Sequence, residues 1–320
     1  MKILVTAIGS MSAPAVINAL KQAGHTVIGC DINPKSWMWA SELVHEFYQA
    51  PHITSVEAYL DFVIRLCQQN NLDIILPITD VEVEVLSANR HIFPKSVTLA
   101  IAGHQAVMIA RDKLRWSHLL SPHLSTIPSC NLKDFIAERW AYPLFLKPAK
   151  GRSSEGTKRI NSSQELAFWQ EHAESGDIIV QPFISGEIYV VDIVRDAKRQ
   201  QSVAIVRKEL LRTVNGAGLT VEICIQPKLE ELANQVACLI DLTGCINIEF
   251  MHLDNTFFLM DINPRFSAGV EFSMLAGYDM VINHLRCFST EPLAPAVAVM
   301  PNIYSRHYVA TKNVIGDEHE

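Results

Sequence analysis

The sequence predicts an α/β protein in which a doubly wound parallel sheet comes first and an α+β region follows. Short apolar runs alternate with helical patterns over about the first 100 residues, as in parallel sheets that carry helices on both faces. A Gly- and Ser-rich loop at 151–156 breaks this alternation, and strand patterns dominate from residue 187 onward. These two changes separate the α+β region from the first sheet.

The first sheet is predicted from apolar runs separated by helical spacing. Residues 2–8 form a short apolar run that ends at Gly9, which suits a strand buried on both faces. Helical spacing follows over 13–23, and Gly24 then serves as a C-terminal stop. Further strands are expected at 25–31, 73–78 and 97–101, with a helix at 55–69.

The remaining chain is expected to combine helices with mainly antiparallel strands. The predicted helices are 112–120, 228–242, 269–276 and 281–288. The predicted strands are 187–196, 202–207, 219–226, 245–251 and 257–263. Pro292, Pro295 and Pro301 lie just before and within the last 25 residues, which have an acidic end, so we expect those residues to be loosely held.

Composition excludes several classes of protein. The chain has 320 residues, of which 49% are hydrophobic, enough to bury a core that offsets chain entropy. The formal net charge is −7, which argues against nucleic acid as a main partner because phosphate backbones attract basic proteins. No run approaches the roughly 20 apolar residues of a membrane-spanning helix, and the first apolar run is too short for a signal-peptide core.

The seven cysteines are scattered and form no Cys-x-x-Cys pair, which makes a zinc site or a disulfide framework unlikely on spacing alone. Most have apolar neighbours, as buried free thiols of a reducing compartment do. We therefore expect a cytoplasmic protein. Three tryptophans, Trp37, Trp39 and Trp116, are expected in the core.

The loop after the first strand raises the question of a dinucleotide site. A glycine between strand and helix, with Asp31 ending the next strand, is part of the nicotinamide-binding fingerprint, but the full fingerprint needs three glycines. Here only Gly9 is present, and Met11 and Ala13 occupy the places where a close approach to pyrophosphate requires glycine. We favour a tight strand-to-helix turn.

The loop at 151–156 has the composition of a phosphate cradle. Its small residues allow backbone N–H groups to point at phosphate oxygens, and Ser153 and Ser154 add hydroxyl donors. Lys147, which ends the preceding apolar run, supplies a positive charge. From these residues alone, a phosphate cradle and an exposed turn are about equally expected.

Two alternating runs near the C-terminus gather oxygen ligands. Asn247 and Glu249 share one face of the first run, and Asp261 and Asn263 share one face of the second. On a common face they would form a hard oxygen site suited to Mg²⁺ that carries nucleotide phosphates. Carboxylates set opposite each other repel unless a cation lies between them, which favours a metal over a solvated hairpin. Arg265 follows, placed to neutralise phosphate or a developing oxyanion.

The loop between these two runs decides whether their polar faces meet. A three-residue loop at 254–256 places Glu249 opposite Asp261. A two-residue turn at 254–255 places the two side chains on opposite faces, because a shift of one residue inverts the pattern of a strand.

In this order and spacing, the motifs resemble those of the ATP-grasp superfamily, and in particular the branch that contains biotin carboxylase and the large subunit of carbamoyl phosphate synthetase. The resemblance runs from residue 1 to about residue 290. It implies a pre-ATP-grasp domain followed by a two-lobed ATP-grasp domain. The implied parts are a Rossmann-like domain at 1–110, a small lid lobe at 111–185, a large lobe with the metal site at 186–300, and a tail at 301–320.

The resemblance also implies ligand-binding roles. The residues that would bind the triphosphate are Lys113, Lys147, Gly151, Ser153, Ser154 and Gly156. Gln181 and the backbone of Phe183 and Ile184 would hold adenine, and Glu187 would hold the ribose. The implied metal ligands are Glu249, Asp261 and Asn263. Asp261 stands where the family has Glu, and its shorter arm leaves open whether one or two ions bind.

The implied function is an ATP-dependent carboxylate–amine (or thiol) ligase with an acyl-phosphate intermediate. Arg265, Lys147 and Arg207 would be its catalytic residues, acting by positioning and charge neutralisation. The implied cofactors are ATP and Mg²⁺, with Mn²⁺ as a substitute, and the partners are a small carboxylate, an amine and a second subunit of a homodimer. Two alternatives remain open: an enzyme that phosphorylates bicarbonate, as carbamoyl phosphate synthetase and the carboxylases do, and a nucleotide-binding protein without turnover.

Overall fold

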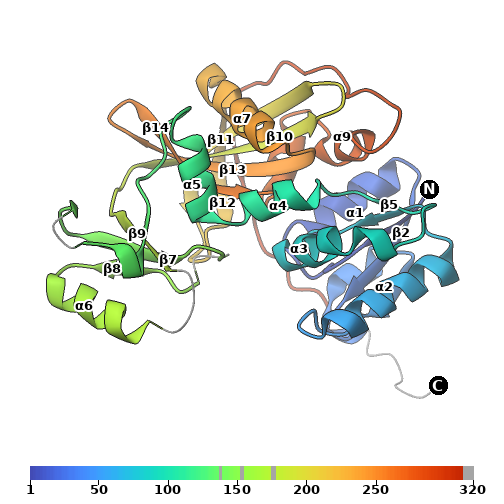
Figure 1. Cartoon of the computed structure of the whole chain (residues 1–320). Helices are drawn as coiled ribbons and strands as arrows, with labels where there is room; N and C mark the ends of the chain where they lie inside the picture. Colours follow the sequence, from blue (N-terminus) through green and yellow to red (C-terminus); the bar gives the residue numbers. More distant parts are fainter. Residues whose placement is uncertain (137–138, 152–154, 174–177, 313–320) are drawn as a thin grey trace.

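The computed structural model of the chain describes residues 1–136, 139–151, 155–173 and 178–312. The strands of this part form three sheets, of five, six and four strands (Figure 1). None of the helices in these ranges is long and apolar enough to cross a membrane.

The first sheet is parallel throughout and has the strand order β3-β2-β1-β4-β5, as the sequence predicted. Its strands are β1 (Lys2–Val5), β2 (Thr26–Asp31), β3 (Glu46–Gln49), β4 (Ile74–Leu76) and β5 (Thr98–Leu99). Its helices are α1 (Ala13–Gln22), α2 (Val56–Asn70), α3 (Asp80–Ala88) and α4 (His104–Ala110). The last two helices were not predicted.

Alternation along β1 shows how this sheet buries both faces. Ile3 and Val5 pack in the cluster that contains the buried side of α1, whereas Leu4 packs in the cluster that contains the buried side of α2. Successive side chains of a strand point to opposite faces, so each helix covers one face. This is the doubly wound arrangement, in which the loops at the carboxyl ends of the strands are free to bind ligands.

The second sheet is small and antiparallel, in the order β6-β9-β7-β8. Its strands are β6 (Cys130–Asn131), β7 (Leu144–Pro148), β8 (Lys158–Ile160) and β9 (Ile178–Pro182). Two helices belong to this part of the chain, α5 (Lys113–Leu120) and α6 (Ser163–His172). The Asp112 side chain caps α5 by accepting from the Arg115 N–H at 3.0 Å. In Figure 1 this sheet lies at the lower left, apart from the first sheet.

The third sheet is antiparallel, in the order β14-β13-β10-β11-β12-β15. Its strands are β10 (Glu187–Asp196), β11 (Gln201–Arg212), β12 (Gly218–Cys224), β13 (Gly244–Leu253), β14 (Thr256–Asn263) and β15 (Asn302–Ser305). Its helices are α7 (Pro227–Ile240), α8 (Val270–Leu275) and α9 (Met280–Arg286). The single-turn 3₁₀ helices are η1 (Lys35–Trp37), η2 (Trp39–Glu42), η3 (Arg90–Ile92) and η4 (Leu132–Asp134).

The C-terminal residues and two of the tryptophans differ from expectation. Residues 302–305 were expected in a loose tail, but they form β15, which pairs with β12 and packs Tyr304 against the core. Trp116 is in the core as expected, whereas Trp37 is 72% exposed and Trp39 is 46% exposed. The domain boundaries drawn from the sequence remain predictions.

A buried histidine joins the first and third sheets. His284 of α9 accepts from the backbone N–H of Cys245 through Nδ1 at 2.8 Å, and its Nε2 lies 3.0 Å from the carbonyl oxygen of Ala100. Burial lowers the pKa of His284 to about 4, so the ring is neutral at pH 7 and has one donor and one acceptor for these two groups. The N-terminal sheet is thereby held beside the sheet that carries the predicted metal ligands.

Candidate active site

A two-residue turn joins β13 to β14. Asp254 and Asn255 have φ values of 47° and 60°, as a type I′ turn requires. Leu253 therefore pairs with Thr256. The three-residue loop that would bring the polar faces together is absent, so this turn alone would separate them.

A β-bulge corrects the register further along the hairpin. The pairing shifts between Glu249 and the following residue of β13, which leaves Met260 of β14 as the extra residue. Beyond the bulge, Glu249 lies opposite Asp261 and Asn247 lies opposite Asn263. The predicted juxtaposition of the two carboxylates is confirmed, although the device that produces it was not predicted.

These side chains line a cavity of about 490 Å³. Besides residues of β10, β11 and β13, four segments that are far apart in the sequence contribute to the lining. They are residues 10–12 before α1, residues 78–80 before α3, residues 212–218 of the β11–β12 hairpin, and residues between 261 and 269 at and after the end of β14. The first two places follow β1 and β4, at the carboxyl ends of parallel strands, where doubly wound sheets bind ligands.

A second cavity, of about 180 Å³, shares Glu249 and Asp261 with the first and adds Lys113 and Lys147. The Nζ atom of Lys113 lies 3.0 Å from Asp261 Oδ1. Lys147 is only 9% exposed, and burial lowers its pKa to about 8, although the nearby charges of Asp261 and Glu249 oppose the shift. A ligand with several negative charges would compensate for the cost of this buried ammonium group.

Both predicted carboxylate ligands already have a cationic partner from the chain. Lys113 contacts Asp261, and Arg212 donates from Nη2 to Glu249 Oε2 at 2.8 Å. Among the described residues there is no group of three His, Cys, Asp or Glu side chains that could hold a metal ion. Two carboxylates and the amide of Asn263 are nevertheless an all-oxygen set. Such a set fits Mg²⁺ that shares its remaining positions with phosphate oxygens and water.

Arg265 faces the large cavity and is held by a residue that sequence reasoning missed. Its Nη2 donates to Asp80 Oδ2 at 2.7 Å, and its Nη1 donates to the carbonyl oxygen of Phe266 at 2.9 Å. Asp80 is 3% exposed. Burial alone would raise the pKa of Asp80, but Arg265 and Arg111 outweigh burial, so its pKa is lowered and it is ionised. The sequence signal that could have identified Asp80 is its position in the segment that follows the predicted strand at 73–78, at the carboxyl end of a parallel strand.

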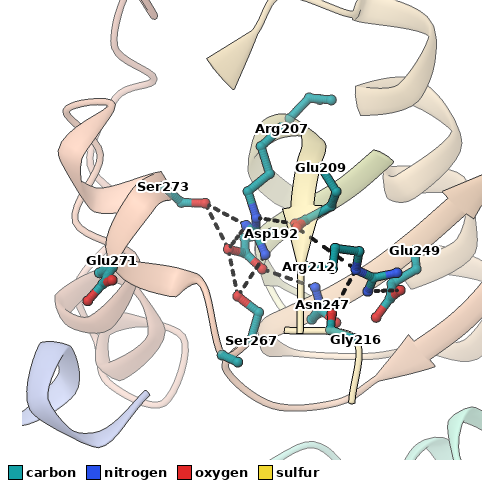
Figure 2. Close-up of polar contacts among 12 residues, drawn as sticks. Asp192, Arg207, Glu209, Arg212, Gly216, Asn247, Glu249, Ser267, Glu271 and Ser273 are labelled. Carbon is teal, nitrogen blue, oxygen red and sulfur yellow. Dashed lines mark hydrogen bonds and ion pairs between the residues drawn. The ribbon is translucent and has the colours of Figure 1, made fainter. Parts of the chain in front are cut away.

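Arg207 lies in the wall of the cavity within a second set of charges (Figure 2). It is 2% exposed. Its Nη1 donates to Asp192 and to Ser273, its Nη2 donates to Ser267, and its Nε donates to Glu209. A guanidinium has five N–H donors, so these partners leave one donor, on Nη2, for a ligand. The catalytic role expected of Arg207 remains a prediction.

Glu209 and Arg212 connect this set to the predicted metal ligands. Figure 2 shows Glu209 between the two arginines, and Arg212 reaching on toward Glu249. Burial raises the pKa of Glu209, against the lowering effect of Arg207 and Arg212. Arg212 also donates from Nε to the carbonyl oxygen of Gly216 at 2.8 Å. Arg212 therefore contacts both Glu249 and the backbone of the β11–β12 hairpin.

The residues expected to hold phosphate lie partly around the smaller cavity. Gly151 lines it, and its carbonyl oxygen lies 3.4 Å from both Arg111 Nη1 and Lys113 Nζ. Gly156 has a φ of +69°, and a Cβ there would come within 3.1 Å of Pro148, so glycine is required at this turn. The two serines expected in the cradle, Ser153 and Ser154, lie outside the described residues.

The residues expected to hold adenine and ribose lie outside the lining of these two cavities, as far as the described residues define it. Gln181 is buried and donates to Ser129 Oγ at 2.7 Å. The N–H of Phe183 donates to the carbonyl oxygen of Pro143 at 3.0 Å. Glu187 forms an ion pair with Lys208. Their roles remain predictions.

The loop after β1 is the tight turn that the sequence favoured. The N–H of Gly9 donates to Asp31 Oδ2 at 2.9 Å, and Asn33 occupies the other oxygen of that carboxylate. A Cβ at Gly9 would lie 3.0 Å from the same Asp31 oxygen. The glycine is therefore explained by the turn, and Asp31 is engaged within the chain rather than turned toward a ribose.

Two family models match the chain. Residues 3–100 match a model described as the PylC-like N-terminal domain. Residues 174–310 match a model described as ATP-grasp in the biosynthetic pathway with Ter operon. The first match covers the parallel sheet, and the second covers the sheet that carries the carboxylate pair.

Curated relatives are similar over part of the chain. The carbamoyl phosphate synthase large chain of Clostridium botulinum is 25% identical over 157 residues, which are 45% of this chain and 15% of that protein. The D-alanine–D-alanine ligase of Francisella tularensis subsp. novicida is 25% identical over 170 residues, which are 49% of this chain and 57% of that protein. The matches thus span less than two thirds of either relative.

A solved structure shares the fold over nearly the whole chain. It is the biotin carboxylase domain dimer of 2-oxoglutarate carboxylase from Hydrogenobacter thermophilus, in complex with MgADP, ADP and bicarbonate. The TM-score is 0.77 at 19% identity, with 92% of this chain and 71% of that chain covered. At this identity the likeness establishes the common fold.

Proposed function

Because residues 174–310 match an ATP-grasp family model, we propose that this chain is an ATP-dependent ligase of the ATP-grasp superfamily, which joins a carboxylate to an amine and releases ADP and phosphate. The observation that carries the proposal is the carboxylate pair of Glu249 and Asp261, which face each other across a hairpin where two cavities meet. Two lysines line one cavity and an arginine with free donors lines the other. This arrangement suits a charged triphosphate next to an acceptor.

We assign the nucleotide to the smaller cavity, between the lid lobe at 111–185 and the large lobe at 186–300. Lys147 and Lys113 would bind phosphate oxygens there, and phosphate in turn would stabilise the protonated form of Lys147. Mg²⁺, or Mn²⁺ in its place, held by Glu249, Asp261 and Asn263, would neutralise charge on the transferred phosphoryl group. The chain's own lysines and arginines would then orient the phosphates for in-line transfer.

The acceptor would lie in the larger cavity. In the first step a carboxylate oxygen of the substrate attacks the γ-phosphorus of ATP, and the bond between that phosphorus and the oxygen of ADP breaks. In the second step the amine nitrogen attacks the carbonyl carbon of the acyl phosphate, the carbon–oxygen bond breaks, and phosphate leaves as the amine loses a proton. Arg265 has Nε and one Nη1 donor without a partner among the described residues, and these would bind oxygens of the transferred phosphate.

ADP release over a panel of carboxylates and amines tests the proposal. Release that requires one carboxylate and one amine together supports the ligase. Release that bicarbonate stimulates without an organic carboxylate supports a bicarbonate-phosphorylating enzyme. Tight binding of Mg·ATP without release under any pair would contradict the ligase and favour a nucleotide-binding protein without turnover. Sedimentation of the same sample tests the homodimer, which we propose from the family resemblance.

A further inference from the structure

One carboxylate connects three segments of the active site that are far apart in the sequence. Asp80 is the first residue of α3, in the N-terminal domain, and only 3% of it is exposed. Its Oδ2 accepts from Arg265, which lies 185 residues further along the chain. Its Oδ1 lies 3.3 Å from Nη1 of Arg111. Asp80 is therefore shared by two arginines.

Asp80 determines where the guanidinium of Arg265 points. It is the one acidic partner of Arg265 among the described residues. The other two partners are a carbonyl oxygen and, at 3.4 Å, the amide oxygen of Asn263. A charge-assisted hydrogen bond of 2.7 Å is stronger than either. It fixes one end of the guanidinium of a residue that lines the large cavity, and two donors keep no partner among the described residues.

The second arginine, Arg111, links Asp80 to Gly151. Arg111 is 5% exposed and lies 3.4 Å from the carbonyl oxygen of Gly151, the first residue of that loop. Lys113 contacts the same carbonyl oxygen and also Asp261. Asp80 is thus linked on one side to the group expected to bind the transferred phosphate, and on the other side to the start of the phosphate loop.

We propose that Asp80 is a positioning residue of the ligase: it orients Arg265 toward the transferred phosphate. This inference rests on the proposed function. It also gives the N-terminal domain a part in the chemistry, because the orienting carboxylate comes from that domain rather than from the ATP-grasp lobes.

The kinetic test compares Asp80→Asn with Glu84→Gln. Glu84 lies on the same helix and is within 3.7 Å of Arg111, but it does not contact Arg265, so its substitution removes an equal charge and leaves the Arg265 contact intact. We expect Asp80→Asn to lower kcat about 100-fold, since small displacements of an oriented group have effects of this size, with the KM for ATP changed less than about threefold. Glu84→Gln should stay near the wild-type kcat, and Asp80→Glu should recover part of the loss.

A double-substitution cycle distinguishes positioning from an independent effect. If Asp80 acts through Arg265, the variant with both Asp80→Asn and Arg265→Gln should be no slower than Arg265→Gln alone. Multiplied losses in the double variant, or an equal loss in Glu84→Gln, would overturn the proposal. Circular dichroism of each variant shows whether it is folded, and Asp80→Glu keeps the test valid if the asparagine variant is not.

An activity-independent measurement separates this proposal from the proposed function. In protein labelled with ¹⁵N-arginine, the Nε–H signal that disappears in Arg265→Lys belongs to Arg265. That signal should be sharp in the wild type and in Glu84→Gln, and broadened or lost in Asp80→Asn. An unchanged signal in Asp80→Asn means that Asp80 does not orient the guanidinium. If no substrate pair releases ADP from the wild type, the proposed ligase function is wrong. The Nε–H signal still shows in that case whether Asp80 orients Arg265.

Discussion

Two clusters of charged residues contribute to the lining of the larger cavity. They differ in how many of their hydrogen-bond donors and acceptors have partners within the chain. The buried cluster consists of Asp192, Arg207, Ser267 and Ser273 (Figure 2). Asp192 is fully buried and accepts from Arg207, from both serines and from Asn247. The cavity cluster consists of Lys113, Lys147, Glu249, Asp261 and Arg265, whose carboxylate side chains are 20% and 25% exposed.

The difference indicates separate tasks for similar residues. In the buried cluster nearly every donor and acceptor has a partner within the chain, so removing one member leaves a buried charge uncompensated. In the cavity cluster the acids pair with Lys113 and Arg212, and two donors of Arg265 have no partner among the described residues, so a ligand can take over the contacts. We therefore expect substitutions in the buried cluster to act on folding, and substitutions in the cavity cluster to act on ligand binding and turnover.

The largest effect is expected from Lys147→Ala. Removal of a buried cation aimed at phosphate should lower ADP formation about 1000-fold or more, and Glu249→Ala should have a similar effect through the metal. Lys150→Ala is the matched control, because Lys150 is exposed three residues further along. Near-normal turnover in Lys147→Ala, with circular dichroism showing a folded protein, would mean that the cavity cluster is not the nucleotide site.

For the free energy of unfolding we expect the opposite order: a substitution in the buried cluster should have the larger effect, and one in the cavity cluster the smaller. Arg207→Met leaves Asp192 buried without its cation, which should lower the free energy of unfolding by about 3–5 kcal/mol. Lys147→Met removes an ammonium group whose pKa burial lowers to about 8, so we expect it to be neutral or stabilising. Urea unfolding of both variants measures this contrast. Equal destabilisation by the two substitutions would remove the distinction between the clusters.

The sequence predicted the parts of the fold that depend on local periodicity. The parallel sheet followed from alternating strands and helices, and the face shared by Glu249 and Asp261 followed from strand alternation. The bulge that aligns them could not be predicted, because Met260 lies in a run of apolar residues where either register buries similar side chains. The sequence left the length of the turn open, and the bulge, which was not foreseen, reverses the separation that a two-residue turn alone would cause.

The parts that were missed depend on contacts between distant segments. Asp80 after a strand is also typical of an ordinary helix start, and its role depends on an arginine 185 residues away. Two of the four hydrogen bonds of Arg207 depend on serines 60 and 66 residues away. Trp37 and Trp39 were expected in the core from residue type alone, yet they lie in the short 3₁₀ helices η1 and η2 after β2 with their side chains exposed. Pattern analysis has no access to such partners.

A smaller effect is expected where the chain's own cation competes with a metal. Arg212→Gln removes the partner of Glu249, so the affinity of the nucleotide-free protein for Mn²⁺ should rise. The ion pair is partly exposed, at 24% and 20% for the two side chains, so we expect about a twofold to fivefold increase. Lys208→Gln, whose ion pair with Glu187 lies outside both cavities, is the control. Unchanged Mn²⁺ affinity in Arg212→Gln would show that the arginine does not compete for this site.

The smallest effect is a pH dependence that originates in Lys147. Its pKa is about 8 in the free protein because burial disfavours the ammonium, and bound phosphate favours it, so the pKa must rise on binding. Nucleotide binding at pH 8 should therefore take up about half a proton, and affinity for a non-hydrolysable Mg·ATP analogue should fall about twofold between pH 7 and pH 8. Calorimetry in two buffers with different ionisation enthalpies measures the uptake. Lys147→Arg, which stays charged, should abolish it, and uptake that persists in that variant would assign the proton to another group.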